Sequence, residues 1–214
     1  MSVEPIEGIK PKVPRYLTAA WGFSVVEMMV AISVSVIMAA IVLVRLQPAL
    51  QGLAADSAMA QVKSVLRQAR ETSISERRDV AVVFLAPNTI QLFRFNVLPG
   101  GAGQVLSAVP FLSVPIEGPT QFLTFAGETD TPDAFGIPAV PAGIMFAGVV
   151  GGPPSGMQFN SDGTFDNGTG TAINGTVFVG FPGTPSSARA ITIMGATGRI
   201  KAYHGDPGTS WWSE

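Results

Sequence analysis

Residues 23–44 read FSVVEMMVAISVSVIMAAIVLV, and Glu27 is the only charged residue among these 22. A helix of this length spans about 33 Å, enough to cross the roughly 30 Å hydrocarbon core of a bilayer. Arg45 ends the apolar run, and residues 1–22, which precede the run, contain three basic residues: Lys10, Lys12 and Arg15. Basic residues on that side favour a cytoplasmic N-terminus. We therefore predict one membrane span over residues 23–45, with the rest of the chain across the membrane.

The apolar run is too long for a cleaved secretory signal, whose hydrophobic part has 7–15 residues. Arg45-Leu46-Gln47-Pro48 is also a poor cleavage site. An uncleaved signal anchor is the simplest interpretation, but it leaves Glu27 unexplained. A charged side chain near the centre of a membrane helix costs about 2.5–3.5 kcal/mol and usually has a partner.

The residues around Glu27 resemble the N-terminal processing motif of type IV pilins and type II secretion pseudopilins: Gly22-Phe23-Ser24-Val25-Val26-Glu27-Met28-Met29-Val30-Ala31-Ile32. The resemblance implies that residues 1–22 are a leader peptide, removed between Gly22 and Phe23 by a prepilin peptidase, and that Phe23 is then N-methylated. It also implies that Glu27 pairs with the N-terminal amine of another subunit in a filament. The implied partners are other pilins or pseudopilins, the peptidase, the inner-membrane assembly platform, and membrane lipid around residues 23–45.

An amphipathic pattern follows the apolar run. Pro48 can kink a helix, but helical spacing resumes at Ala54. Apolar or small residues then recur at i, i+3, i+4 and i+7: Ala58, Val62, Val65, Leu66, Ala69, Ser73 and Ile74. We predict that the helix continues over residues 46–78 and lies on a globular domain.

Beyond residue 78 the pattern is that of short strands separated by Gly, Pro, Asn and Asp turns. The candidate strands are Asp79–Leu85, Thr89–Phe95, Val105–Val114, Gln121–Ala126, Gly143–Val150, Gly156–Asn160, Gly175–Phe181, Arg189–Met194 and Arg199–His204. Many short strands after one long helix predict an α+β fold. We expect a long N-terminal helix, membrane-spanning in its first half and amphipathic in its second, packed on an antiparallel β-sandwich in the manner of pilins.

Three short motifs in residues 79–214 and in the helix before them resemble the GspH/FimT-type minor pseudopilins. They are Ala69-Arg70-Glu71 with Ile74 and Arg77 before the strand Val80–Phe84; Met157-Gln158-Phe159 before Asp162-Gly163; and Ala190–Met194 before Gly198-Arg199-Ile200. The resemblance implies a structural subunit that assembles or primes a type II secretion pseudopilus or type IV pilus and acts in protein secretion. It places the chain in a bacterial inner membrane with its C-terminal domain in the periplasm. Residues 97–155 match no family pattern.

Composition argues against catalysis. The 214 residues include no cysteine and one histidine, His204, which excludes thiolate metal sites and cysteine nucleophiles and nearly all histidine chemistry. Only 13% of the residues are charged, against about 25% in an average domain. We predict no enzyme activity, cofactor or metal. An oxygen-rich loop is the best candidate for Ca²⁺, but its residues are also common turn formers: Asn160, Asp162, Asp166 and Asn167. A second acidic stretch, Glu128, Asp130 and Asp133, is weaker.

Two alternatives to a plain filament subunit stay open. Some FimT-like minor pilins capture DNA, and Arg189, Arg199 and Lys201 could form a small basic patch. We do not expect a nucleic-acid partner, because DNA binding needs clustered basic residues. Removal of residues 1–22 leaves ten basic and thirteen acidic residues, a net charge of −3. The other alternative is a signal-anchored β domain with no filament role. Trp211-Trp212 could contact a partner, but we expect the tail to dock on its own sheet.

Overall fold

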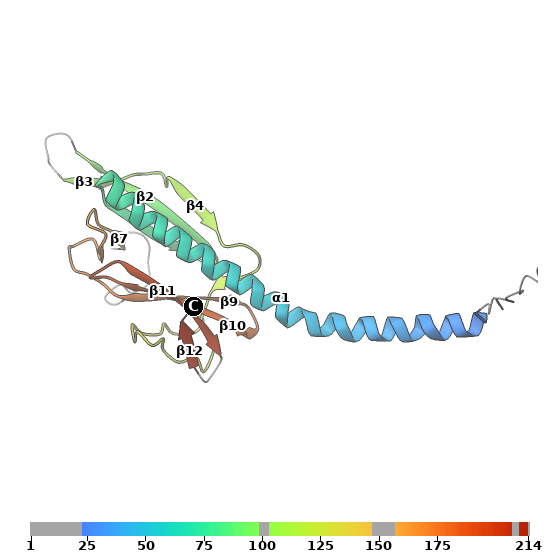
Figure 1. The fold of residues 1–214 in the computed structure, drawn as a ribbon. Coiled ribbons are helices and arrows are strands. Elements are labelled where there is room, and N and C mark those ends of the chain that lie inside the picture. Colours follow the sequence, from blue (N-terminus) through green and yellow to red (C-terminus); the bar gives the residue numbers. More distant parts are fainter. Residues whose placement is uncertain (1–22, 99–102, 147–156, 207–209, 214) are drawn as a thin grey trace, which may run out of the picture. The chain divides into compact units, whose positions relative to one another are not determined.

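The computed structural model describes residues 23–98, 103–146, 157–206 and 210–213 (Figure 1). One helix, α1 (Val25–Glu76), precedes twelve strands. The chain divides into two compact units, Met1–Val44 and Arg45–Glu214, and α1 contributes to both. The second unit contains every strand.

Local hydrogen bonds define both ends of α1. At the start, the Ser24 side chain accepts a hydrogen bond from the Val26 amide at 3.3 Å, which makes Ser24 the N-cap. The helix continues through Pro48. It ends where Arg77 adopts a left-handed conformation (φ 51°) and the Arg78 amide donates to the Ser73 carbonyl. This bond and that from the Arg77 amide to the Ile74 carbonyl form a Schellman motif, with arginine where glycine is usual.

The strands form two antiparallel sheets. The first has the order β3-β2-β1-β7-β8, with β4 also paired to β2. Its strands are β1 (Val80–Leu85), β2 (Thr89–Val97), β3 (Gln104–Leu106), β4 (Leu112–Pro115), β7 (Gln158–Phe159) and β8 (Phe165–Asp166). The second has the order β12-β11-β10-β9-β5, with β6 also paired to β9. Its strands are β5 (Gln121–Phe122), β6 (Ile144–Phe146), β9 (Gly175–Phe181), β10 (Thr184–Met194), β11 (Arg199–Asp206) and β12 (Ser210–Ser213). The predicted fold class, one long N-terminal helix on antiparallel sheets, is confirmed.

Several predicted strands are wrong in extent. Val105–Val114 is two strands, because the Ser107 side chain accepts a hydrogen bond from the Val109 amide and Pro110 has no amide hydrogen to continue the pairing. Both resulting strands, β3 and β4, pair with β2 at different ends. Three other predicted strands reduce to β5, β6 and β7, and the parts of them within residues 147–156 lie outside the described residues. The short strands β8 and β12 were not predicted.

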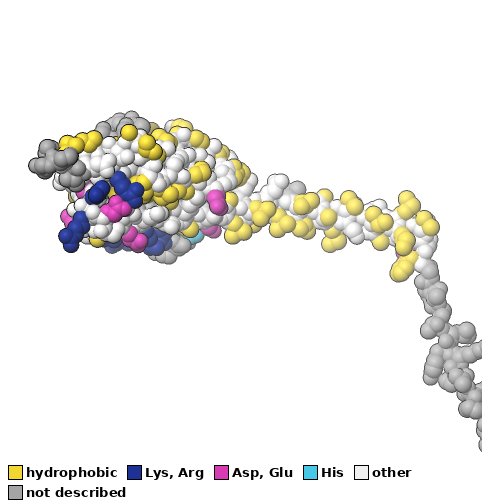
Figure 2. Space-filling model, turned by 90° about the horizontal axis from the view of Figure 1, so that it is seen from above, with side chains coloured by type: hydrophobic (Ala, Val, Ile, Leu, Met, Phe, Trp, Pro, Cys, Tyr) yellow, Lys and Arg dark blue, Asp and Glu magenta, His cyan; other side chains and the backbone are white. Residues whose placement is uncertain are grey.

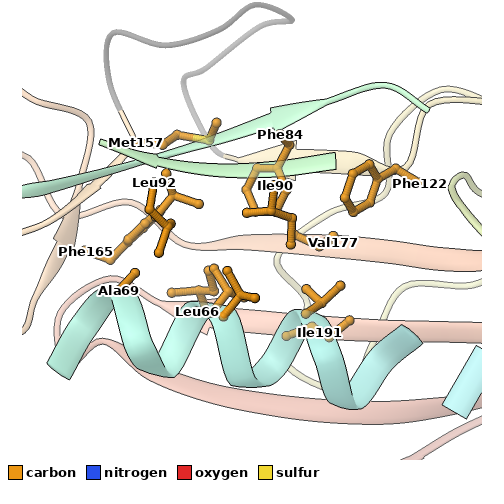
Figure 3. Packing of buried hydrophobic residues seen from close by; sticks show 14 of the residues in the cluster. Leu66, Ala69, Phe84, Ile90, Leu92, Phe122, Met157, Phe165, Val177 and Ile191 are labelled. Carbon is orange, nitrogen blue, oxygen red and sulfur yellow. The ribbon is translucent and has the colours of Figure 1, made fainter. Parts of the chain in front are cut away.

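The larger of two hydrophobic clusters among the described residues joins the helix to both sheets. The inward face of α1 contributes Ala58, Met59, Val62, Leu66 and Ala69. Opposite them lie Val82, Ile90, Leu92 and Phe159 of the first sheet and Val177, Ile191 and Ile193 of the second. Figure 3 shows Leu66 and Ala69 on the helix face that is turned toward Ile90 and Leu92. The spacing read from the sequence therefore marks the buried face from Ala58 to Ser73, as predicted, whereas Ile74, which was assigned to the same face, is 44% exposed.

Arg70 fastens α1 to two turns of the domain. Its guanidinium donates to the Gly163 carbonyl at 3.1 Å through Nε and to the Thr197 carbonyl at 3.0 Å. The turns also meet each other. A Cβ placed on Gly198 would lie 1.9 Å from the Gly163 oxygen, and φ is positive at both glycines. The three motifs that resemble the GspH/FimT branch thus converge in space at Arg70.

We expect Arg70→Ala to destabilise the domain by about 2–3 kcal/mol, because two backbone carbonyls lose a charged donor. For a domain of this size that lowers the Tm by about 4–12 °C. Thermal unfolding of the detergent-solubilised chain measures the change. Arg67→Ala is the matched control, since the exposed Arg67 side chain makes no hydrogen bond to the described residues. Equal Tm values for the two variants would contradict the role given to Arg70.

Candidate membrane-anchoring and assembly segment

The first half of α1 is a helix whose apolar side chains are exposed. Every described side chain from Phe23 to Leu43 is exposed, and the most apolar 18-residue window has a mean hydropathy of 2.5. By length and composition this helix could cross a membrane. Figure 2 shows apolar side chains following one another along this part of the chain, while the basic and acidic ones gather on the domain. An all-round apolar helix needs lipid or other helices around it.

The hydroxyl groups within this segment are satisfied by the helix itself. Ser33 and Ser35 each donate to the carbonyl four residues earlier, at 2.7 and 2.8 Å. Such bonds allow serine to lie in an apolar environment. Glu27 is different, because no hydrogen bond or ion pair joins it to any described residue. Its carboxylate is the one polar side chain between residues 25 and 43 that depends on a partner from elsewhere.

Glu27 lies in the first turn of α1, three residues after the N-cap Ser24. The spacing Ser-x-x-Glu is that of a capping box, in which an acidic side chain also meets the positive end of the helix dipole. The charge of Glu27 therefore also meets the helix dipole, beside the intersubunit role that the resemblance implies. A glutamine keeps the capping-box spacing and the size of the side chain, but removes the charge.

The predicted processing site is only partly within the described chain. Phe23 is described and exposed, and it directly precedes the N-cap. Gly22 lies outside the described residues, as does the predicted leader, residues 1–22. Cleavage between Gly22 and Phe23 and methylation of Phe23 remain predictions.

An exposed apolar stripe continues beyond Arg45, on the part of α1 that belongs to the second unit. Leu46, Leu50 and Leu53 are 48%, 61% and 65% exposed. Their i, i+4, i+7 spacing places them on one helix face, opposite the buried face that includes Ala55 and Ala58. Small residues follow on the same face: Ser57, Ala60 and Ser64. The stripe was not predicted from the sequence; it can pack against another helix but not against this domain.

The loop considered for Ca²⁺ uses its oxygen atoms to hold its own turns. Asp162 accepts from the Thr164 amide, and Asp166 accepts from the Gly168 amide and from the Asn160 side chain. Asn167 accepts from the Thr169 amide and hydroxyl. Among the described residues no three acidic or histidine side chains gather as metal ligands. The loop is a pair of tight turns.

The second acidic stretch fixes a loop over the outer face of the second sheet. Asp130 accepts from the Thr131 and Gly136 amides, and Trp211 donates from its indole nitrogen to the Thr129 carbonyl at 2.6 Å. The Trp211 ring lies 5.8 Å from that of Phe178. The tail therefore docks on its own sheet at Trp211, as predicted.

The three basic residues considered for DNA do not form one free patch. Arg189 pairs with Asp56 of α1, and its side chain is only 9% exposed. Arg199 and Lys201 lie 3.6 and 3.5 Å from Asp133. Arg199 also joins Arg67 and Arg70 of α1 around an open groove of about 480 Å³, which was not predicted from the sequence. Arg70 already donates to two carbonyls there.

Comparison with known proteins gives structural likenesses. No family model and no curated protein sequence matches the chain. The solved structures that it resembles include the type IV minor pilin FimU of Pseudomonas aeruginosa in two crystal forms and the minor pseudopilin EpsH from the Type 2 Secretion System of Vibrio cholerae. All three are minor pilins or pseudopilins.

These likenesses are distant. The two FimU structures are 16% and 17% identical to the chain; they cover 74% and 73% of it and 91% and 96% of their own length, with TM-scores of 0.43 and 0.42. EpsH is 12% identical, covers 70% of the chain and 96% of its own length, and has a TM-score of 0.40. TM-scores below 0.5 do not establish a family, so the function is inferred below from the chain's own residues.

We expect Asp133→Asn to destabilise the domain at pH 7 by about 1–3 kcal/mol. Burial raises the pKa of Asp133, but hydrogen bonds from Thr192 and Tyr203 and the charge of Lys201 outweigh it and hold this pKa below its usual value. Such a group contributes stability above its unfolded pKa of about 3.9, and the contribution is lost as the pH falls through the lower folded pKa.

The difference in Tm between the native chain and Asp133→Asn should therefore shrink as the pH is lowered below about 4. Thermal unfolding at neutral pH and over a series of acidic buffers measures it. A difference that stays the same at every pH would show that the carboxylate charge contributes nothing.

Proposed function

We propose that the chain is a minor pilin or minor pseudopilin: a structural subunit, not an enzyme, that enters a filament through α1. One observation carries the proposal. Glu27 is a carboxylate without a partner among the described residues, in the first turn of an exposed apolar helix whose N-cap, Ser24, follows Gly22-Phe23 in the sequence. Cleavage at this bond would create a cationic amine on Phe23. Such an amine on a neighbouring subunit offers Glu27 the opposite charge that it lacks.

The exposed stripe Leu46, Leu50 and Leu53 favours a filament subunit over a plain membrane anchor. An anchor needs apolar side chains only where the helix meets lipid. These three leucines lie after Arg45, on the face that the chain's own domain leaves uncovered. Residues 23–45 would pack against lipid in the membrane and against other subunits in the filament, and the stripe would extend that packing toward the domain.

The finer features of the proposal follow the sequence resemblance. Prepilin peptidase would remove residues 1–22 and methylate Phe23, and the chain would stand in a bacterial inner membrane with residues 79–214 in the periplasm before assembly. The partners would be other pilins or pseudopilins and the assembly platform. The convergence of three motifs at Arg70 supports the GspH/FimT branch, because it gives them one shared structural role. Both a type II secretion pseudopilus and a type IV pilus fit.

A DNA-binding pilin is the second candidate, and one observation favours it. Arg67 and Arg199 line one side of the domain around Arg70. The charge balance weighs against it, since Asp133 lies beside Arg199 and the chain without residues 1–22 carries a net charge of −3. Binding of a polyanion depends on releasing counterions to several basic groups. We therefore rank assembly above nucleic-acid capture.

The proposal predicts that loss of the Glu27 charge leaves processing of the chain unchanged but impairs its assembly into filaments. In a host with an active prepilin peptidase, intact mass spectrometry should find both the native chain and Glu27→Gln without residues 1–22 and with a methyl group. Filament incorporation of Glu27→Gln should fall on the order of tenfold, because an amine held in an apolar setting loses its counter-charge.

Glutamine keeps the capping-box spacing and the size of the side chain, so Glu27→Gln tests the charge alone. Glu27→Ala should lose incorporation to at least the same degree. Normal incorporation of Glu27→Gln would contradict the charge-pairing role, and a native chain that keeps residues 1–22 would contradict the pilin assignment itself.

The stripe gives an independent prediction. Leu50→Asp should reduce incorporation on the order of tenfold or more, because a carboxylate would enter an apolar helix–helix contact. Cleavage and the Tm of the domain should not change, since Leu50 is 61% exposed. Val109→Asp, at a position that is 70% exposed away from the stripe, is the matched control. Equal incorporation of the two variants would show that the stripe makes no contact.

A further inference from the structure

An open apolar groove of about 620 Å³ lies at one end of the domain. It lies between the β1–β2 turn, which contributes Pro87 to its lining, and the β9–β10 turn, which contributes Pro182. Phe122, Leu123 and Phe125 form much of its wall. Every residue that lines the groove is uncharged. Such a surface is unlike the opposite end of the domain, where the groove beside Thr197 is lined by three arginines.

The groove lies at the end of the domain where α1 enters it. Thr184, which follows the β9–β10 turn, donates from its hydroxyl to the Gln51 side chain at 2.8 Å. At the other end of β10, the turn after Met194 contacts Arg70 through the Thr197 carbonyl. The strand therefore runs along α1 from Gln51 to Arg70. The start of β10, beside which the groove lies, is therefore the end of the strand nearer to Arg45.

The distance along the helix from Arg45 to Gln51 is short. Six residues of α-helix rise about 9 Å. The polar interface on each side of a bilayer is about 5–8 Å thick, the difference between a core of 30 Å and a full thickness of 40–45 Å divided over two sides. If Arg45 marks the membrane boundary, the end of the domain with the groove is within reach of the lipid headgroups.

The rim of the groove suits an interfacial position. Pro87, Pro141 and Pro182 are exposed on it, and Val140, next to Pro141, is 55% exposed. Proline has no amide hydrogen, so these positions present few unpaired donors to lipid. Apolar side chains at an interface gain from burial in the boundary between headgroups and acyl chains.

We propose that this end of the domain rests on the outer surface of the bilayer before the subunit enters a filament, with the groove and its proline rim in contact with lipid. The inference rests on the proposed function, because it needs residues 23–45 to span the membrane. The lipid surface is favoured as occupant over a second copy of the chain, because this end of the domain is the one near Arg45 and the groove carries no charge that would select a protein partner.

The absence of native cysteines allows a direct test. Full-length chain with Pro182→Cys is labelled with an environment-sensitive fluorophore and reconstituted into phosphatidylcholine–phosphatidylglycerol vesicles. Quenching by headgroup-nitroxide lipid is then measured. Ala196→Cys, in the exposed turn beside Thr197, is the control at the other end, and Val36→Cys reports the anchor. We expect severalfold stronger headgroup quenching at 182 than at 196, and quenching at 36 by acyl-chain nitroxide.

The outcomes separate this inference from the proposed function. Equal headgroup quenching at 182 and 196, with normal acyl-chain quenching at 36, would overturn the lipid contact and leave the anchor intact. Loss of quenching at 36 would overturn both. Quenching at 182 that appears only at high protein density, in step with cross-linked dimers, would assign the groove to a second copy and also overturn the lipid contact.

A charge variant tests whether the apolar rim causes the contact. Val140→Asp in the Pro182→Cys background should lower headgroup quenching severalfold, because a carboxylate on the rim opposes burial. Val109→Asp, on an exposed site elsewhere in the domain, should leave it unchanged. Quenching that is unchanged by Val140→Asp would show that proximity alone, without apolar contact, brings position 182 near the headgroups.

Discussion

The structure depends on a helix that its own chain covers only in part. Within the domain, one face of α1 is buried against both sheets through Met59, Val62 and Leu66. Every described side chain from Phe23 to Leu43 is exposed, and just after Arg45 the leucine stripe remains exposed. Exposed apolar surface of this extent is unfavourable in water, so the chain is stable only where lipid or other helices supply the missing contacts. Membrane insertion and filament assembly are two solutions to the same problem.

Much of this could be predicted from the sequence. The apolar run, its single carboxylate and the helical spacing from Ala58 to Ala69 were sufficient to predict the long helix and its buried face. These signals are strong because they repeat over many turns. The hairpin of β1 and β2 was predictable as well, since both strands are long and bounded by turn residues.

The errors have identifiable physical causes. Strands of two residues, such as β7 and β8, are too short to show an alternation of apolar and polar residues. They form because neighbouring strands pair with them. The turn at Ser107 within the predicted strand Val105–Val114 arises from a side-chain hydrogen bond that composition does not reveal. The leucine stripe after Arg45 was missed because it lies on the face opposite the periodic one and becomes visible only when burial is known. The pairing of Arg189 with Asp56 was also not predicted, because these residues are far apart in the sequence.

The way Arg70 and the core hold α1 has a mechanical consequence. In the proposed filament subunit, tension on residues 23–44 would reach the domain through α1. Tension along the helix axis within the domain would shear the packed side chains from Ala58 to Ala69 and the two bonds of Arg70 together, whereas a perpendicular pull would separate them one after another. The domain should therefore resist tension along this part of α1 better than tension across it.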